Sequence, residues 1–319
     1  SRLGMEHLFC QRSIIKMSHI NPKDAFRLPT FRIDSDGGLS PEALRSWQGA
    51  GCLVIENFCD ERARRELIRA ADSIVAQFDM TDRDAIFSTQ THEHARNKYF
   101  ETSGDKIRCF FEENALNQNG DLLVPKEQSI NKIGHALHDL HPVFERFSYQ
   151  PRIARLMQEL GIDDPRLLQS MFIFKQPGIG GEVNWHQDGS FLYTSPPSVT
   201  GLWFALEDAT LENGCLWALP GQHTRGLRSR FLRVNGELIM EDSLSPPNFD
   251  EDQGVPLEVP AGSLIIIHGA LPHYSARIEA KIPICVHVAC HSGTAVYPED
   301  NWLQRGQDLP LRRLTPIRH

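Results

Sequence analysis

A histidine and a carboxylate separated by one residue form the first candidate for chemistry in this sequence. His186 and Asp188 flank Gln187 in the run Trp185-His186-Gln187-Asp188-Gly189. On an extended strand, residues i and i+2 point to the same side, so the imidazole and the carboxylate can converge on one cation. Such a mixed nitrogen and oxygen pair suits iron(II), and a second imidazole would complete a facial triad that leaves open positions. The pair alone also fits purely structural roles.

The second imidazole is expected after an apolar strand late in the chain. The run Leu264-Ile265-Ile266-Ile267-His268 follows a glycine turn, and His273 comes five residues after His268. A jelly roll would return a ligand at this point to the first pair. We therefore predict His273 as the third ligand, with His268 as the alternative. Two polar histidines at a strand end are the competing interpretation.

Other catalytic motifs do not fit. The glycines of 178–181 lack the third glycine of a dinucleotide-binding loop, because Val183 occupies that position. The sequence has no phosphate-binding P-loop, no H-E-x-x-H and no G-x-S-x-G. A zinc hydrolase is disfavoured, since no general base stands beside the H-x-D pair.

Composition narrows the class of protein. The 319 residues include 33 basic and 41 acidic ones, giving a net charge of -8, and 40% are hydrophobic. That balance argues for a folded chain and against a nucleic-acid partner. No apolar run reaches the roughly 18 residues of a membrane span, so we expect no membrane partner. Seven cysteines without C-x-x-C pairs fit a reducing compartment, and we expect the cytoplasm.

The chain is expected to form one catalytic domain over residues 40–319, preceded by a flexible extension over residues 1–39. A mitochondrial transit segment is the alternative reading of that extension. Ser40-Pro41-Glu42 and Asp60 predict two helix starts. Helices are also predicted at 129–140 and 151–160, and residues 82–128 are expected to be irregular. Short apolar runs predict strands at 171–174, 199–206, 215–219, 257–259, 264–267 and 284–289. Helices followed by short strands that turn residues separate predict a mainly β fold with α. We expect a double-sheet jelly roll braced by N-terminal helices.

Longer stretches carry a family resemblance. They are Ser103-Gly104-Asp105-Lys106-Ile107-Arg108, residues 129–138, Gln169-Ser170-Met171, Phe174-Lys175-Gln176-Pro177, residues 207–216 and Pro220-Gly221-Gln222-His223-Thr224. With these runs, roughly residues 40–305 resemble the phytanoyl-CoA dioxygenase family of iron(II)/2-oxoglutarate oxygenases. The resemblance implies a cupin-like double-stranded β-helix with iron(II) at His186, Asp188 and His273 and no further catalytic residue. It also implies 2-oxoglutarate and O2 as cosubstrates, and hydroxylation of a C–H bond in a small or acyl-type substrate, with succinate and CO2 formed.

The resemblance also implies a cosubstrate pocket. Family members carry an arginine for the far carboxylate of 2-oxoglutarate where this chain has Lys281, and close relatives carry a lysine where it has Gln128. Because one ammonium replaces a planar bidentate fork, the exchange is not neutral. Trp203, Met171 and Ser275 match other pocket positions, although ordinary core packing also explains the first two. The alternative function is a metal-binding barrel that lost or altered turnover and acts in binding or regulation.

The substrate itself is not encoded in a readable motif. Trp185, Phe191 and Tyr193 are predicted to form a pocket wall near the metal, although barrel cores use the same residues. Specificity is expected from residues 82–128 and 226–256, which connect the predicted elements. A CoA thioester would prefer a basic mouth, which Arg225, Arg228, Arg230 and Arg233 could provide. A solvated loop is the competing interpretation of these arginines.

Overall fold

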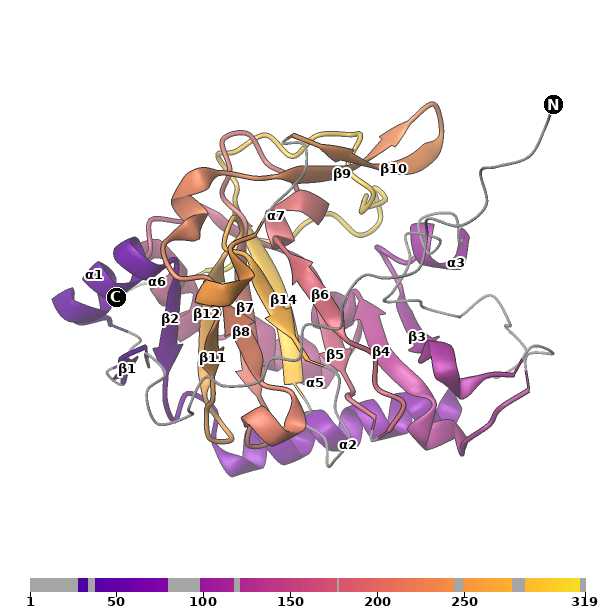
Figure 1. The fold of residues 1–319 in the computed structure, drawn as a ribbon. Helices are drawn as coiled ribbons and strands as arrows, with labels where there is room; N and C mark the ends of the chain where they lie inside the picture. The colour runs from indigo at the N-terminus through magenta and orange to yellow at the C-terminus, as the bar shows by residue number, and fades with distance from the viewer. Residues whose placement is uncertain are drawn as a thin grey trace, which may run out of the picture.

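Two β-sheets face each other, and helices pack on the outer side of the larger sheet (Figure 1). A computed structural model describes residues 28–33, 38–79, 98–117, 121–176, 178–243, 249–276 and 285–315. The helices are α1 (Pro41–Ala50), α2 (Glu61–Gln77), α3 (Lys98–Glu101), α4 (Leu137–Leu140), α5 (Pro142–Ser148), α6 (Pro151–Glu159) and α7 (Asp188–Phe191). The strands are β1 (Thr30–Phe31), β2 (Cys52–Ile55), β3 (Ile107–Phe111), β4 (Ile130–His135), β5 (Pro165–Ile173), β6 (Val183–His186), β7 (Thr200–Ala205), β8 (Leu216–Ala218), β9 (Ser229–Val234), β10 (Glu237–Asp242), β11 (Val255–Leu257), β12 (Leu264–His268), β13 (His273–Ser275) and β14 (Cys285–Ser292).

The sheet order confirms the predicted jelly-roll class. The larger sheet runs β1-β2-β12-β7-β14-β5-β4-β3, and the smaller sheet runs β11-β8-β13-β6. Within these two sheets, the described strands pair antiparallel except for β1 with β2. The sheets do not close into a barrel, and β9 and β10 form a separate hairpin.

Alternation along the strands divides the core in two. On β7 and β12, Leu202, Phe204, Leu264 and Ile266 join the cluster formed with the helices. Their neighbours Trp203, Ala205, Ile265 and Ile267 join a second cluster with β8 and β11 of the smaller sheet. Successive strand residues point to opposite faces, so one face of the larger sheet holds the helices and the other lines the space between the sheets. We call that space the lumen.

Local signals set the helix starts as predicted. The Ser40 Oγ accepts a hydrogen bond from the Ala43 N–H at 3.2 Å, and the Asp60 carboxylate accepts one from the Ala63 N–H at 2.8 Å. Both contacts satisfy donors that the first turn of a helix leaves unpaired. Gly51 ends α1 with φ of 74°, a conformation that glycine adopts without strain.

Two predictions about the middle of the chain were wrong. Residues 129–140 form β4 and the short α4 instead of one helix, because β4 inserts between β3 and β5 and all six of its residues are buried. The described part of residues 82–128 is not wholly irregular, since β3 lies within it and pairs with β4. In both places, pairing with distant strands outweighs the local periodicity.

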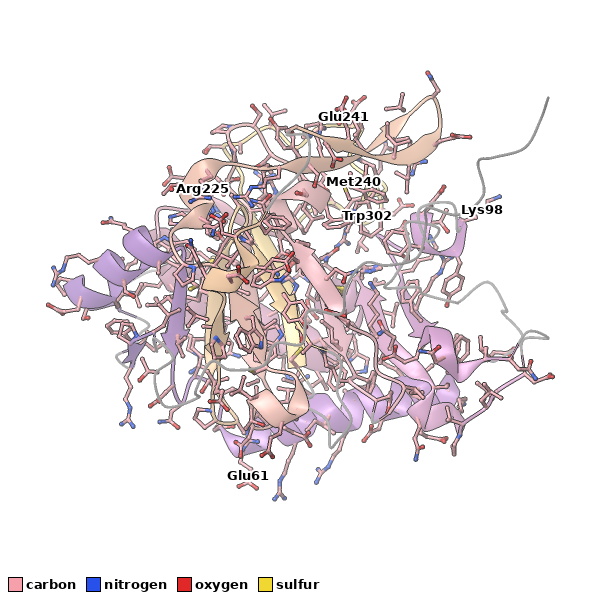
Figure 2. The ribbon with its side chains drawn as sticks, viewed as in Figure 1. Glu61, Lys98, Arg225, Met240, Glu241 and Trp302 are labelled. Carbon is pink, nitrogen blue, oxygen red and sulfur yellow. The ribbon has the colours of Figure 1, made fainter. Side chains whose placement is uncertain are left out.

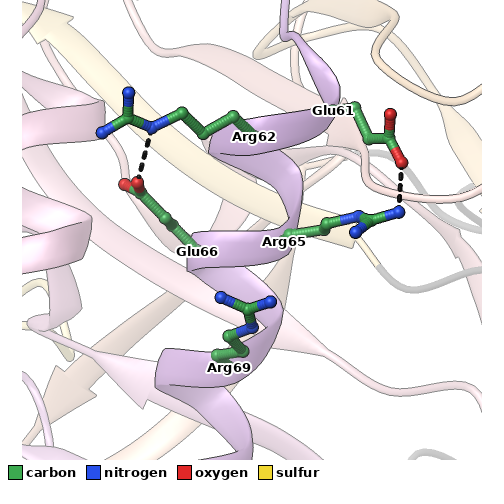
Figure 3. A pocket seen from close by; sticks show the side chains of 5 residues that line it. All are labelled: Glu61, Arg62, Arg65, Glu66 and Arg69. Carbon is green, nitrogen blue, oxygen red and sulfur yellow. Dashed lines mark hydrogen bonds and ion pairs between the residues drawn. The ribbon is translucent and has the colours of Figure 1, made fainter.

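A hollow lies on the exposed face of α2 (Figure 3). It is lined by Glu61, Arg62, Arg65, Glu66 and Arg69. Arg62 pairs with Glu66 at 3.0 Å and Arg65 pairs with Glu61, each one turn apart. Such exposed i,i+4 pairs support a helix modestly, and we assign this hollow no function.

Within the predicted N-terminal extension, residues 30–31 pair with β2, while residues 1–27 and 34–37 lie outside the described residues. In the part of the chain that the structure describes, no helix is long and apolar enough to cross a bilayer.

Candidate functional site

The H-x-D pair stands where β6 passes into α7. His186 is the last residue of β6, Gln187 is extended with φ of -124° and ψ of 127°, and Asp188 begins α7. On the neighbouring strand, His273 begins β13 and pairs directly with His186. The register between two strands therefore brings a late histidine to the H-x-D pair.

Gln187 fixes this junction. Its side-chain amide donates to the Gly226 carbonyl at 2.9 Å and to the Ala270 carbonyl at 2.6 Å. Its oxygen accepts from the Arg228 N–H at 2.9 Å, and the residue is 1% exposed. Three hydrogen bonds, two of them fully buried, thus tie the residue between the two predicted ligands to two other segments.

The ligand atoms of His186, Asp188 and His273 all lie within 4.8 Å of one another. Asp188 Oδ1 is 3.7 Å from His186 Nε2 and 3.6 Å from His273 Nε2. The two imidazole rings have centroids 4.2 Å apart. Among the described residues, this is the group of three or more histidine, cysteine or acidic side chains with the spacing of a metal site.

Backbone carbonyls determine which ring nitrogens are free. His186 Nδ1 lies 2.8 Å from the Asn184 carbonyl, and His273 Nδ1 lies 3.0 Å from the Leu271 carbonyl. Because a carbonyl only accepts, each Nδ1 carries a proton, so Nε2 is the nitrogen that a neutral imidazole would offer as a ligand. Metal-binding histidines are oriented by this kind of hydrogen bond, so the donor set fits a metal ion.

The charges at the group also fit a cation. Burial by itself raises the pKa of Asp188, but His287, His273 and His186 together lower it well below the ordinary range. Burial and the neighbouring His186 lower the pKa of His273 to about 4. At neutral pH the site therefore presents an ionised carboxylate beside a neutral His273.

His287 is a residue at this site that the sequence reasoning missed. It lies on β14, is 5% exposed, and places Nε2 3.2 Å from Asp188 Oδ2. The sequence predicts 284–289 only as a short apolar strand. A histidine between Val286 and Val288, on the face opposite to both valines, was the available signal.

Three residues predicted for the cosubstrate lie on lumen strands near this group. In register, His287 pairs with Met171 of β5 on one side and Trp203 of β7 on the other. Ser275 follows His273 on β13, is buried, and donates to the Gly214 carbonyl at 2.8 Å. Gln128, in contrast, is exposed in the turn over 126–128. Lys281 lies outside the described residues.

Two buried lysines are not among the site residues predicted from the sequence. The Lys175 ammonium, just beyond β5, donates to the Ala276 carbonyl at 2.7 Å, just beyond β13, so its side chain spans the two sheets. Lys132 on β4 has its ammonium 5.5 Å from the Phe100 ring centroid and 5.4 Å from that of Phe110. Burial lowers the pKa of Lys175 to about 8 and that of Lys132 to about 7.

The predicted pocket wall is only partly assembled. Phe191 lies beside the triad, with its ring centroid 6.2 Å from that of His186. The rings of Trp185 and Tyr274 stack with their centroids 5.3 Å apart. Trp185 precedes His186 on β6 and Tyr274 follows His273 on β13, so both side chains point away from the face that carries the two histidines. Trp185 therefore lies on the outer face of the smaller sheet, which corrects its predicted place beside the metal. Tyr193 lies under the Arg230 guanidinium, 4.3 Å from it.

Of the four arginines of the predicted basic mouth, Arg230 and Arg233 lie on β9, and Arg225, labelled in Figure 2, and Arg228 lie in the segment before it. Arg225 pairs with Asp250 at 2.6 Å, Arg230 pairs with Asp300, and Arg233 lies 3.6 Å from Glu101. Arg228 is 2% exposed and donates to Gln222. Three of the four charges thus already face a carboxylate.

The alternative ligand, His268, lies elsewhere. Its Nδ1 accepts from the Ala270 N–H at 3.0 Å, and its ring contacts those of His223 and Trp47 at centroid distances of 5.1 and 5.9 Å. The structure therefore brings His273, and not His268, to the H-x-D pair.

Sequence comparison gives matches over most of the chain. The family model described as Phytanoyl-CoA dioxygenase (PhyH) matches residues 47–281. The chain is 44% identical over 274 residues to Phytanoyl-CoA dioxygenase of Arabidopsis thaliana, covering 85% of this chain and 95% of that protein. It is also 44% identical over 284 residues to Phytanoyl-CoA dioxygenase domain-containing protein 1 of Bos taurus, covering 86% and 97%.

Solved structures share the fold at low sequence identity. The non-heme alpha ketoglutarate dependent carbocyclase SnoK from nogalamycin biosynthesis aligns with a TM-score of 0.59 and 17% identity, over 88% of this chain and 94% of its own. EctD from S. alaskensis with bound Fe aligns with a TM-score of 0.57 and 19% identity, over 89% of each chain. At this identity the likeness establishes the architecture alone.

Proposed function

Since the chain belongs to the phytanoyl-CoA dioxygenase family, we propose that it is an iron(II)- and 2-oxoglutarate-dependent dioxygenase that hydroxylates a C–H bond of a small or acyl-type molecule. The observation that most supports this proposal is the group His186, Asp188 and His273, whose ligand atoms lie within 4.8 Å of one another. Two imidazoles and one carboxylate form the donor set of non-haem iron(II) oxygenases. When bound, iron(II) with 2-oxoglutarate and O2 supplies the oxidant for hydroxylation, and succinate and CO2 are released.

The residues of the site have separable tasks in this proposal. His186 and His273 would bind through Nε2, because their Nδ1 protons are donated to the Asn184 and Leu271 carbonyls. Asp188 offers the negative charge. Three protein ligands would leave coordination positions of a bound iron(II) for the cosubstrates.

The lumen supports binding of an anionic cosubstrate. Trp203 and Met171 flank His287 in register, and Ser275 lies two residues beyond His273. Lys175 brings a buried ammonium to the strand end beside Ser275. In a low-dielectric site one ammonium attracts a carboxylate strongly, so Lys175 and Lys281 are both candidates to hold the far carboxylate of 2-oxoglutarate.

The mouth favours an uncharged or weakly charged substrate. Arg225, Arg230 and Arg233 face Asp250, Asp300 and Glu101, so little positive charge remains for the phosphates of a CoA thioester. Phe191 lies beside His186 and packs on Phe231 at a centroid distance of 5.5 Å, which supplies an apolar contact near the metal.

The test is turnover of 2-oxoglutarate to succinate. Protein loaded with iron(II) without oxygen is mixed with 2-oxoglutarate, oxygen is admitted, and succinate is quantified. We expect slow succinate formation without added substrate, lost in His273→Gln and retained in the matched His268→Gln control. The lysine that binds the cosubstrate is identified with the variants Lys175→Met and Lys281→Met, and Lys126→Met is the control. Loss of that lysine should raise the half-saturating concentration of 2-oxoglutarate.

Iron binding without succinate would call for a direct binding titration of 2-oxoglutarate. Absence of binding in that titration would contradict the proposed activity and favour the alternative of a metal-binding barrel without turnover.

A further inference from the structure

The carboxylate of Asp188 divides its two oxygens between different partners. Oδ1 lies 3.7 and 3.6 Å from the Nε2 atoms of His186 and His273. Oδ2 points the other way and lies 3.2 Å from His287 Nε2. Among the described residues, neither Oδ2 nor the ring nitrogens of His287 make a hydrogen bond, so these buried polar atoms have only their mutual 3.2 Å contact.

The larger sheet sets the position of His287. β14 lies between β5 and β7, and His287 pairs with Met171 and Trp203 across the two ladders. Its neighbours Val286 and Val288 face the helical core, so the imidazole projects into the lumen. The His287 ring is 5% exposed, and it belongs to a central strand rather than to a loop, so the packing around it holds it in place.

A glycine keeps the contact open. Gly201 of β7 lies so close that a Cβ there would be 2.8 Å from both Asp188 Oδ2 and His287 Nε2. Any larger residue would push between the carboxylate and the imidazole. The absence of a side chain at this one position is therefore required for the Asp188–His287 contact.

We propose that His287 is a positioning residue, which donates its Nε2 proton to Asp188 Oδ2 and so turns Oδ1 toward the two ligand histidines. The inference rests on the metal site of the proposed function. A donor on the far oxygen stabilises the carboxylate and fixes its rotation before metal arrives. Partners of this kind typically raise metal affinity about 10- to 100-fold.

The experiment measures binding of cobalt(II) to the metal-free protein through its visible absorption spectrum. His287→Leu should weaken binding about 10- to 100-fold and change the spectrum, because the carboxylate loses its donor. His287→Gln can place an amide N–H near the former Nε2 and should recover most of the affinity. His287→Asn, whose shorter amide reaches only the former Nδ1, should not.

His291 provides a matched control on the same strand. It is 3% exposed and its ring nitrogens also have no hydrogen-bond partner among the described residues. His291→Leu should leave the cobalt(II) affinity and spectrum of the wild type unchanged. This control separates loss of a buried imidazole from loss of the donor to Asp188.

Three outcomes would overturn the positioning role. They are wild-type affinity in His287→Leu, equal loss in the glutamine and asparagine variants, and equal loss in His291→Leu. If His287→Leu does not fold, the comparison of glutamine with asparagine decides alone. A wild-type protein that binds no cobalt(II) would instead refute the metal site itself, so the two failures are distinguishable.

Discussion

Replacing Gly201 with alanine should push the Asp188 carboxylate and the His287 imidazole apart. The new Cβ would lie 2.8 Å from Asp188 Oδ2, 2.8 Å from His287 Nε2 and 3.7 Å from His287 Cδ2. The first two distances are shorter than any ordinary van der Waals contact of a methyl group. Because Asp188 and His287 are both buried, neither can move away into solvent.

The size of the effect follows from overpacking. Forcing one extra methyl group into a packed interior costs about 1–3 kcal/mol. If that cost falls on the carboxylate that binds the metal, it corresponds to roughly 5- to 150-fold weaker cobalt(II) binding, since about 1.4 kcal/mol is a factor of ten. Any part of this cost that destabilises the folded protein as a whole lowers the midpoint of thermal unfolding instead.

Cobalt(II) titration and thermal unfolding followed by circular dichroism measure both parts on the same samples. Gly49→Ala is the matched control, because its Cβ would meet no atom within 4 Å. Alanine is favoured over glycine in a helix, so this control should keep its metal affinity and unfold at the same or a higher temperature. A Gly201→Ala protein with wild-type affinity and an unchanged midpoint would refute the close approach of Asp188 and His287.

Three further changes probe the scaffold. Gln187→Leu should lower the free energy of unfolding by about 2–4 kcal/mol in urea denaturation, because three backbone partners, two of them in the buried residues Ala270 and Arg228, lose their hydrogen bonds. The exposed Gln77→Leu should change it by less than about 0.5 kcal/mol. Asp60→Ala removes the cap of α2 and should cost about 1 kcal/mol in the same assay, whereas Asp72→Ala in the middle of α2 should not. Burial raises the pKa of Asp139, but contacts with His138, Tyr149 and Arg305 outweigh it and lower the pKa from 3.8 to about 2. Its ionised form therefore stabilises the fold above about pH 4, and this contribution is lost as the pH falls toward 2. Asp139→Asn should cost about 2–3 kcal/mol at pH 7, with a difference from the wild type that shrinks in acid; a difference independent of pH would contradict this account.

Signals confined to a few neighbouring residues could be read directly from the sequence. Ser40 and Asp60 predict the starts of α1 and α2, because a cap needs only a side chain and the turn that follows it. The H-x-D run needs only one extended residue to bring its imidazole and carboxylate together. Alternating apolar residues separated by turns likewise predict a two-sheet fold, since burial of one strand face is a local pattern.

Tertiary structure alone decided which distant residues meet. Pairing of β6 with β13 places His273 beside His186, and β14 carries His287 to Asp188 from a hundred residues away in the chain. Strand pairing also explains why residues 130–135 form β4 although their periodicity is helical, and why Trp185 lies on the outer face of its sheet. A shift of one residue in register reverses the face of every side chain on a strand, and register depends on partners far away in sequence. Residue types therefore limited the chemistry available to this protein, whereas the pairing of its strands determined which residues could perform it.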